Sequence, residues 1–213
     1  MSPSRSLARV ACLAAACVAL AGCVSLFPKA VPAQLYRFGA PDAADGAAAS
    51  PPAQTGGSVI WEGAIEFDPA ASNDRILTMT DKDAAYVAGA RWVSPASVLY
   101  DQALVRTFER TPGAPRLVPR FGLLRAPLLM NLDVENFEAR YDQGPKAPPL
   151  VMVKVHAVLI RTEDRSVVSE QTFTTTVRAS DNRIGPIVEA FDGAVGKTLA
   201  DIVAWTGAAP HTP

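Results

Sequence analysis

The sequence predicts an α+β domain in which two main helices pack on one face of a largely antiparallel sheet. In two segments, 95–110 and 187–205, apolar residues recur at intervals of three or four, which is the period of a helix. Three long runs lie between these segments, at 128–135, 151–159 and 167–177, and alternate apolar with polar residues. Short polar turns separate the runs, and this combination is typical of antiparallel hairpins.

The amino terminus indicates the compartment. Arg5 and Arg9 precede an apolar run of about a dozen residues, too short to cross a bilayer that needs about 20. The run ends in Leu20-Ala21-Gly22-Cys23, which resembles the lipobox of bacterial lipoproteins. The resemblance implies that residues 1–22 are a cleaved signal peptide and that Cys23 carries lipid. The alternative is an ordinary secretory signal that happens to contain a cysteine.

Cleavage would remove Cys12 and Cys17, so that no disulfide could form within the mature chain. Val24 stands where such signals carry Asp for inner-membrane retention, which favours the outer membrane of a host with two membranes. Residues 23–57 are expected to form a lipidated tether, with a short strand near 35–38 and a flexible linker rich in Ala, Pro and Gly.

The folded domain is expected over residues 58–206, followed by a short tail at 207–213. Three short strands are predicted at its start, over 59–67, 75–80 and 86–92, because β-branched and aromatic residues there are bounded by Gly, Pro and Asp.

The first helix is predicted to have Ser94 as its N-cap and Pro95 as its first residue, where the missing N–H has no effect. It is predicted to end at Thr111-Pro112-Gly113, and a proline-containing connection then leads to the long strands. The second helix is predicted to follow Gly185-Pro186 and to end near Trp205.

Composition excludes several classes of protein. The chain has 213 residues, with 20 Lys and Arg against 21 Asp and Glu, so it lacks the basic footprint of a nucleic-acid binder. Hydrophobic residues make up 49%, which suits a packed core and not a disordered chain. Three Cys and two His offer little material for a metal site.

No catalytic motif stands out. Gly193-Ala194-Val195-Gly196-Lys197-Thr198 ends like a phosphate-binding loop, but Phe191 occupies the position of its first Gly, and the segment lies in a helical pattern. His156 is expected in the middle of a strand, as an ordinary solvated side chain. Asp133 and Glu135 are adjacent on the wet face of a strand, which does not indicate two carboxylates facing each other across a cleft. We therefore predict no enzyme activity, no cofactor and no metal.

Four segments together carry a family resemblance. They are Leu35-Tyr36-Arg37-Phe38, Ala90-Arg91-Trp92-Val93-Ser94-Pro95, Asp133-Val134-Glu135-Asn136-Phe137, and the helix from Ala190 to Trp205. In this pattern of spaced residues the chain resembles the ABC-type transport auxiliary lipoprotein component family, which accompanies MCE-type lipid transport systems. The similarity covers nearly all of the mature chain.

The resemblance implies a domain like the N-terminal domain of TolB and a non-catalytic role. Such a lipoprotein would stand on the periplasmic face of the outer membrane, held there by its lipid anchor. It would engage an MCE-type substrate-binding protein and its ABC permease and ATPase complex, and so help phospholipids or other hydrophobic molecules cross the periplasm. The resemblance leaves open whether the chain forms homo-oligomers. Arg91, Trp92 and Trp205 are the candidate partner-contact residues, and the alternative is that the two tryptophans only complete the core.

Two other classes of function stay open. The domain could itself be a lipid carrier, with an acyl chain enclosed between helices and sheet. It could also be a structural lipoprotein of the envelope, using a TolB-like domain to join peptidoglycan or Tol-type complexes.

Overall fold

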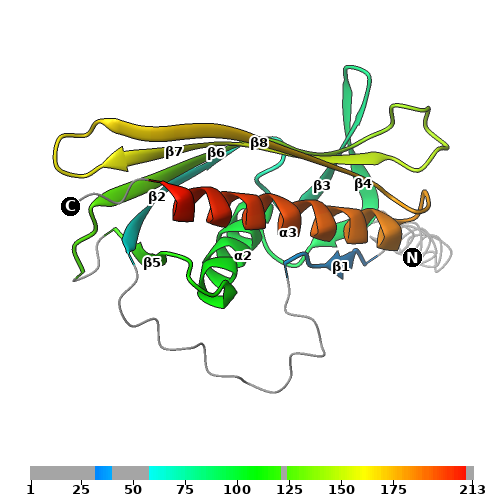
Figure 1. The fold of residues 1–213 in the computed structure, drawn as a ribbon. Helices are drawn as coiled ribbons and strands as arrows, with labels where there is room; N and C mark the ends of the chain where they lie inside the picture. The colour runs from blue at the N-terminus through cyan, green and yellow to red at the C-terminus, as the bar shows by residue number, and fades with distance from the viewer. Residues whose placement is uncertain (1–31, 40–57, 121–123, 210–213) are drawn as a thin grey trace, which may run out of the picture. The chain divides into compact units, whose positions relative to one another are not determined.

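The computed structural model describes residues 32–39, 58–120 and 124–209, and Figure 1 shows their helices and strands. The strands are β1 (Gln34–Tyr36), β2 (Val59–Phe67), β3 (Arg75–Thr80), β4 (Asp83–Trp92), β5 (Arg116–Pro119), β6 (Leu128–Arg140), β7 (Leu150–Arg161) and β8 (Val167–Arg178). The helices are α2 (Ala96–Arg110) and α3 (Ile184–Ala208). The predicted signal peptide, Cys23 and the last residues of the predicted tail lie outside the described residues.

The sheet is mixed, so the prediction of a largely antiparallel sheet is wrong. Strand β6 pairs antiparallel with β7, which pairs antiparallel with β8. On its other side, β6 pairs in parallel with β2 along its first half and with β3 near its end. The pairs β2–β5 and β1–β4 are also parallel, whereas β3 and β4 form an antiparallel hairpin. Four of the seven pairings among the described strands are thus parallel.

The missed pairings share one physical cause. A short turn between two alternating runs indicates a hairpin, but parallel neighbours are joined by long crossovers that leave no local signal. Strands β2 and β3 lie end to end beside β6, and the Asp68 N–H between them donates to the Val134 carbonyl at 3.1 Å. Strand β5, which was not predicted, has only four residues and ends in Pro119.

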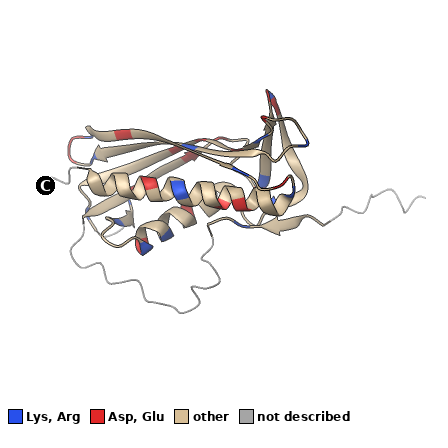
Figure 2. Cartoon of the chain, turned by 45° about the vertical axis from the view of Figure 1, so that its right-hand side comes forward, with Lys and Arg blue, Asp and Glu red and all other residues tan. Residues whose placement is uncertain are grey.

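Both helices lie on the same face of the sheet (Figure 1), and the prediction of two such helices is confirmed. Helix α3 packs against β7 and β8, and α2 packs against α3, β5 and β2. Neither helix is long and apolar enough to cross a membrane, as far as the described residues extend. Lys and Arg are interspersed with Asp and Glu over the helices and strands (Figure 2).

Helix α2 begins differently from the prediction. Pro95 occupies the N-cap position and no side chain caps the helix, so the assignment of Ser94 as N-cap is wrong. The loop between β2 and β3 satisfies the first turn instead, because Ala96 N–H donates to the Asn73 carbonyl at 2.9 Å and Ser97 N–H to the Ser72 carbonyl at 3.3 Å. Backbone groups from a distant loop thus replace the expected side-chain cap.

Aromatic rings fill the space between sheet and helices. Trp92 lies at the centre of this aromatic cluster, with its ring centroid 5.0 Å from that of Phe38 and 5.3 Å from that of Phe191. The Phe137 ring centroid lies 5.1 Å from that of Phe38 and 4.9 Å from that of Phe191. Edge-to-face and tilted ring pairs of this kind are favourable beyond the area that they bury.

The segment around β1 is fixed to both helices. Gly39 N–H donates to Asp192 Oδ1 on α3 at 2.6 Å, and Arg106 on α2 donates to the Gly39 carbonyl at 2.5 Å. Gly39 has φ +62°, and a Cβ there would lie 2.6 Å from the Ala103 Cβ. The compact unit begins at Ala33. The Ala-, Pro- and Gly-rich stretch 40–57 therefore connects two parts of this one unit.

Candidate functional site

Trp92, the first candidate contact residue, closes β4 immediately before α2 and is 1% exposed. Its indole is enclosed by the protein's own aromatic rings, and its Nε1 is buried with no hydrogen-bond partner among the described residues. In this conformation its side chain supports the core and offers no surface to a partner.

Arg91 and Trp205 differ from Trp92 in their surroundings. The Arg91 guanidinium is exposed and donates to both carboxylate oxygens of Asp74 at 3.0 Å. Trp205 is half-buried near the end of α3, where its Nε1 donates to Ser169 Oγ at 3.1 Å and its ring packs 5.8 Å from that of Phe173. Both side chains hold elements together, and Arg91 is also accessible. Cys23, the predicted lipidation site, lies outside the described residues.

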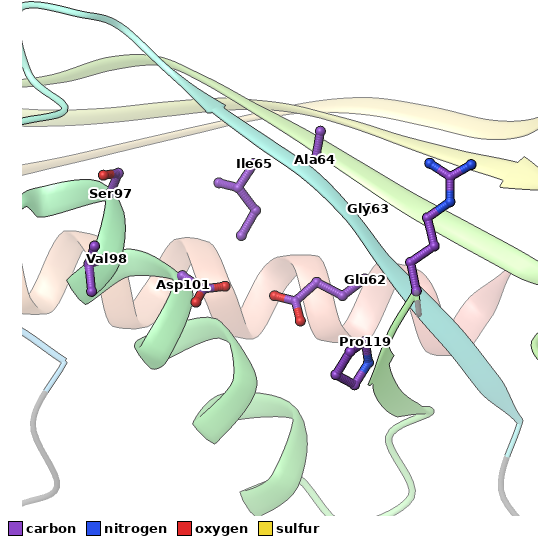
Figure 3. Close-up of a pocket in the computed structure, with 9 residues that line it drawn as sticks. Glu62, Gly63, Ala64, Ile65, Ser97, Val98, Asp101 and Pro119 are labelled. Carbon is purple, nitrogen blue, oxygen red and sulfur yellow. The ribbon is translucent and has the colours of Figure 1, made fainter. Parts of the chain in front are cut away.

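A pair of carboxyl groups that was not predicted lies in an open pocket of about 520 Å³ between β2 and α2. Glu62 comes from β2 and Asp101 from α2, and their carboxyl groups point toward each other (Figure 3). The pocket is completed by small and apolar residues and by one arginine: Gly63, Ala64, Ile65, Ser97, Val98, Pro119 and Arg120.

Local irregularity in β2 brings Glu62 to this position. The register against β6 shifts between Glu62 and Ile65. Gly63 lies at the shift, where a Cβ would overlap Asn131 Oδ1 and come within 2.6 Å of the Met130 carbonyl. The Asn131 amide oxygen accepts the Ala64 N–H at 3.1 Å, replacing a lost ladder hydrogen bond. The shift is a bulge that directs a carboxylate toward the helix layer.

The pKa of Glu62 is raised from 4.5 to about 7. Burial contributes most, and the hydrogen bond to Asp101 and the negative charge of Asp101 add to it. Glu62 Oε1 is buried with no hydrogen-bond partner among the described residues. The pair can therefore hold a proton near neutral pH. The described residues contain no group of three or more His, Cys, Asp or Glu that could hold a metal ion.

A second pocket, of about 420 Å³, lies on the sheet face opposite the helices. Trp61, Leu129 and Ile160 are neighbours across β2, β6 and β7 and give it an apolar floor. The remaining lining is cationic or polar: Arg120, Arg161, Thr162 and Arg165. Sequence reasoning missed both pockets, since each joins residues far apart in the chain. The only local signal was Gly63 inside an apolar run.

Solved structures share this fold. Protein XCC0632 from Xanthomonas campestris, described as family DUF330, is 22% identical, with a TM-score of 0.64 over 70% of this chain and 83% of that one. The hypothetical protein CT253 from Chlamydia trachomatis is 10% identical, with a TM-score of 0.50 over 71% of this chain and 96% of that one. At these identities the likeness concerns the fold alone. Comparison with curated proteins gave no significant match.

The sequence profile of the ABC-type transport auxiliary lipoprotein component family matches residues 40–203. The match takes in β2 to β8, all of α2, and α3 as far as Val203. It includes the motifs at 90–95 and 133–137 and most of the motif in α3, whereas the motif at 35–38 lies before it. The chain belongs to the ABC-type transport auxiliary lipoprotein component family.

Proposed function

We propose that this chain is the lipid-anchored, non-catalytic adaptor of an ABC transporter of the MCE type, which moves phospholipids or other hydrophobic molecules. Its place would be the periplasmic face of the outer membrane, with Cys23 as the lipidated residue. The single observation that carries the proposal is the family match over residues 40–203. The lipobox-like Leu20-Ala21-Gly22-Cys23 and Val24 after it support the anchor and the choice of membrane.

The distance from the anchor to the folded unit is short. Only the nine residues Val24 to Pro32 separate Cys23 from Ala33, where the compact unit begins. Nine extended residues span at most about 30 Å. The linker-like stretch 40–57 adds no reach, because it begins and ends in the folded unit. The adaptor would thus work close to the leaflet that holds it, and its partner would have to come to that distance.

Crosslinking in living cells tests the adaptor role. The full-length chain is crosslinked, isolated from membranes under denaturing conditions, and its partners are identified by mass spectrometry. Recovery of an MCE protein together with an ABC permease or ATPase supports the proposal. Recovery of peptidoglycan-associated or Tol proteins instead would favour the structural lipoprotein and overturn it.

A second candidate function, lipid binding by the domain itself, has one specific observation in its favour. The pocket above Trp61 combines an apolar floor with three arginines, which suits a molecule with an anionic head and an apolar tail. The space between helices and sheet is less suited, because core side chains such as Phe137 and Phe191 fill it. Native mass spectrometry of the full chain and of Trp61→Ala, searching for co-purified lipid, distinguishes a carrier from a pure adaptor.

A further inference from the structure

The borders of the sheet differ greatly in length. Among the described strands, β1, β5 and β8 each have one edge without a neighbouring strand. Strand β1 has three residues, and β5 has four and ends in Pro119. Strand β8 has twelve residues and lies along the border of the sheet above α3 (Figure 1). Proteins commonly protect such an edge with short strands, prolines or charges. Strand β8 is the longest of these three edge strands.

The backbone of β8 directs alternate residues toward the open edge. Ala179 N–H donates to the Pro149 carbonyl at 3.0 Å, and the pairing with β7 then runs without a shift from Arg178 back to Ser169. Odd-numbered residues of this stretch therefore bond to β7, because antiparallel hydrogen bonds alternate. The N–H and C=O groups that point outward belong to Glu170, Thr172, Thr174, Thr176 and Arg178.

No charge or proline interrupts the middle of this edge, residues 171–177. The side chains of Thr172, Thr174 and Thr176 are exposed on the face away from the helices. On the other face, Phe173 packs against Trp205, and Thr175 Oγ1 accepts a hydrogen bond from Thr198 Oγ1 at 2.9 Å. Helix α3 thus holds β8 in place through contacts on one face of the strand.

We propose that two copies of this chain pair through β8, antiparallel and centred on Thr174. In this register Thr174 lies opposite Thr174 of the second copy, and Thr172 lies opposite Thr176. Glu170 then lies opposite Arg178. The outward backbone groups could form about ten hydrogen bonds, two for each facing pair. Thr–Thr pairs and opposite charges are favourable cross-strand neighbours.

The charges at the two ends of the strand select this register. A shift by two residues would place Arg178 opposite Thr172 and leave both charged side chains without an opposite charge across the pair. Arg178 also binds Asp142, with contacts of 2.6 and 2.8 Å, and donates to the Pro148 carbonyl at 2.9 Å. Its Nε–H and one Nη2 hydrogen have no partner among the described residues, so Glu170 of a second copy could accept from them.

Cysteine crosslinking of the full-length chain in native membranes tests the register. Facing residues of a hydrogen-bonded pair have Cα atoms about 5.5 Å apart, which a disulfide can bridge. Thr174→Cys should therefore form a disulfide dimer. Thr172→Cys is the matched control, because its two copies would be about 13 Å apart, four residues along a strand. Its dimer yield should be at least about tenfold lower, while co-expressed Thr172→Cys and Thr176→Cys chains should crosslink.

The unmodified chain, treated in the same way, measures any background from Cys23. A Thr174→Cys disulfide to a different protein would identify another occupant of the edge and overturn the proposal. Equal dimer yields from Thr172→Cys and Thr174→Cys, or no dimer from Thr174→Cys, would overturn it as well.

A proline variant provides an independent readout. The Thr174 N–H points away from β7, so Thr174→Pro removes an edge donor without removing a bond to β7. We expect the mass in detergent solution to fall from dimer to monomer, with the circular dichroism spectrum retained. Thr174→Val should stay a dimer. A monomeric unmodified chain, or a dimeric Thr174→Pro that remains folded, would contradict pairing through β8.

Discussion

At the scale of single residues, the bulge in β2 determines the chemistry of the main pocket. Gly63 allows the strand to approach β6 closely where the register shifts, and Glu62 is thereby directed at Asp101. Half-burial beside a second carboxylate is unfavourable for a negative charge. The protein therefore carries a carboxyl group that releases its proton near neutral pH, where most glutamates are already ionised.

Replacing Glu62 by Gln should change the dependence of stability on pH. The native pKa of about 7 lies above the unfolded value of 4.5, so between these values the native state retains a proton that the unfolded state has released. The free energy of unfolding should therefore fall as pH rises from 4.5 to 7, and stay low above it. Because Glu62 is only half-buried, we expect an effect of about 1 kcal/mol after solvent screening.

Urea unfolding at pH 5 and pH 8 measures this effect. Glu62→Gln should be more stable than the unmodified chain at pH 8. Its free energy of unfolding should also change less between pH 5 and pH 8. Glu66→Gln, at an exposed position of the same strand, is the matched control and should leave the curve unchanged. Parallel curves for the unmodified chain and Glu62→Gln would show that this carboxyl group is not coupled to folding.

Gly63→Ala should destabilise the fold. A methyl group there would overlap Asn131 Oδ1 and the Met130 carbonyl, and the bulge leaves little room for adjustment. We expect a loss of about 1–3 kcal/mol, the range of overpacked sites, measured by chemical unfolding. Gly193→Ala on α3 is the control, since no atom lies within 4 Å of its added Cβ. Helix propensity should make that control neutral or slightly stabilising.

At the scale of elements, β1 shows how a three-residue strand is held in place. Its pairing with β4 is short, but Phe38 beyond it is fully buried against Trp92 and Phe137. Gly39 then bonds to both helices. The segment by which the chain enters the fold is thus fixed by packing and by hydrogen bonds to helices far along the sequence, and its own strand contributes little.

Phe38→Ala should destabilise the protein by about 3–5 kcal/mol and release residues 33–39 from the fold. Limited proteolysis should then cleave within this segment, and urea unfolding should shift to lower concentration. The matched control is Leu35→Ala in the same segment, because the Leu35 side chain is 60% exposed. It should change stability by no more than about 0.5 kcal/mol. Equal effects of the two substitutions would argue against Phe38 as the anchor.

At the scale of the whole molecule, the anchor and the folded unit have to act together. A single acyl chain holds a protein only weakly, whereas two or more hold it stably. With the proposed lipidated Cys23 and a fold that begins at Ala33, the nine residues between them could span at most about 30 Å. A partner that spans the periplasm would meet it there at high effective concentration.

Cys23→Ser should move the protein from the membrane fraction to the soluble fraction, because the sulfur that would carry the lipid is removed. Fractionation followed by intact-mass measurement of the mature chain checks this. Cys17→Ser is the control, since Cys17 would leave with the signal peptide. Its mature product should stay in the membrane and have the same mass, lipid included, as the mature chain without a substitution. A mature chain that begins elsewhere than Cys23, or lacks acyl mass, would contradict the anchor.

Local features of the sequence determined the elements that depend on neighbours along the chain. Helix α3 and the hairpins β6–β7 and β7–β8 follow from apolar periodicity and polar turns. The family motifs are spaced residues that could be recognised without coordinates, and the family match over residues 40–203 confirms the family. The proposed lipidation at Cys23 also depends on a linear motif alone.

Only the tertiary structure decided which distant segments meet. The parallel pairings of β2 and β3 with β6, the cap of α2 by Ser72 and Asn73, and the approach of Glu62 to Asp101 all join parts of the chain with no short connection. Periodicity reports which face of an element is apolar, but it does not report which other element covers that face. The order of the strands, and with it the open edge of β8, is set by packing around the shared aromatic core.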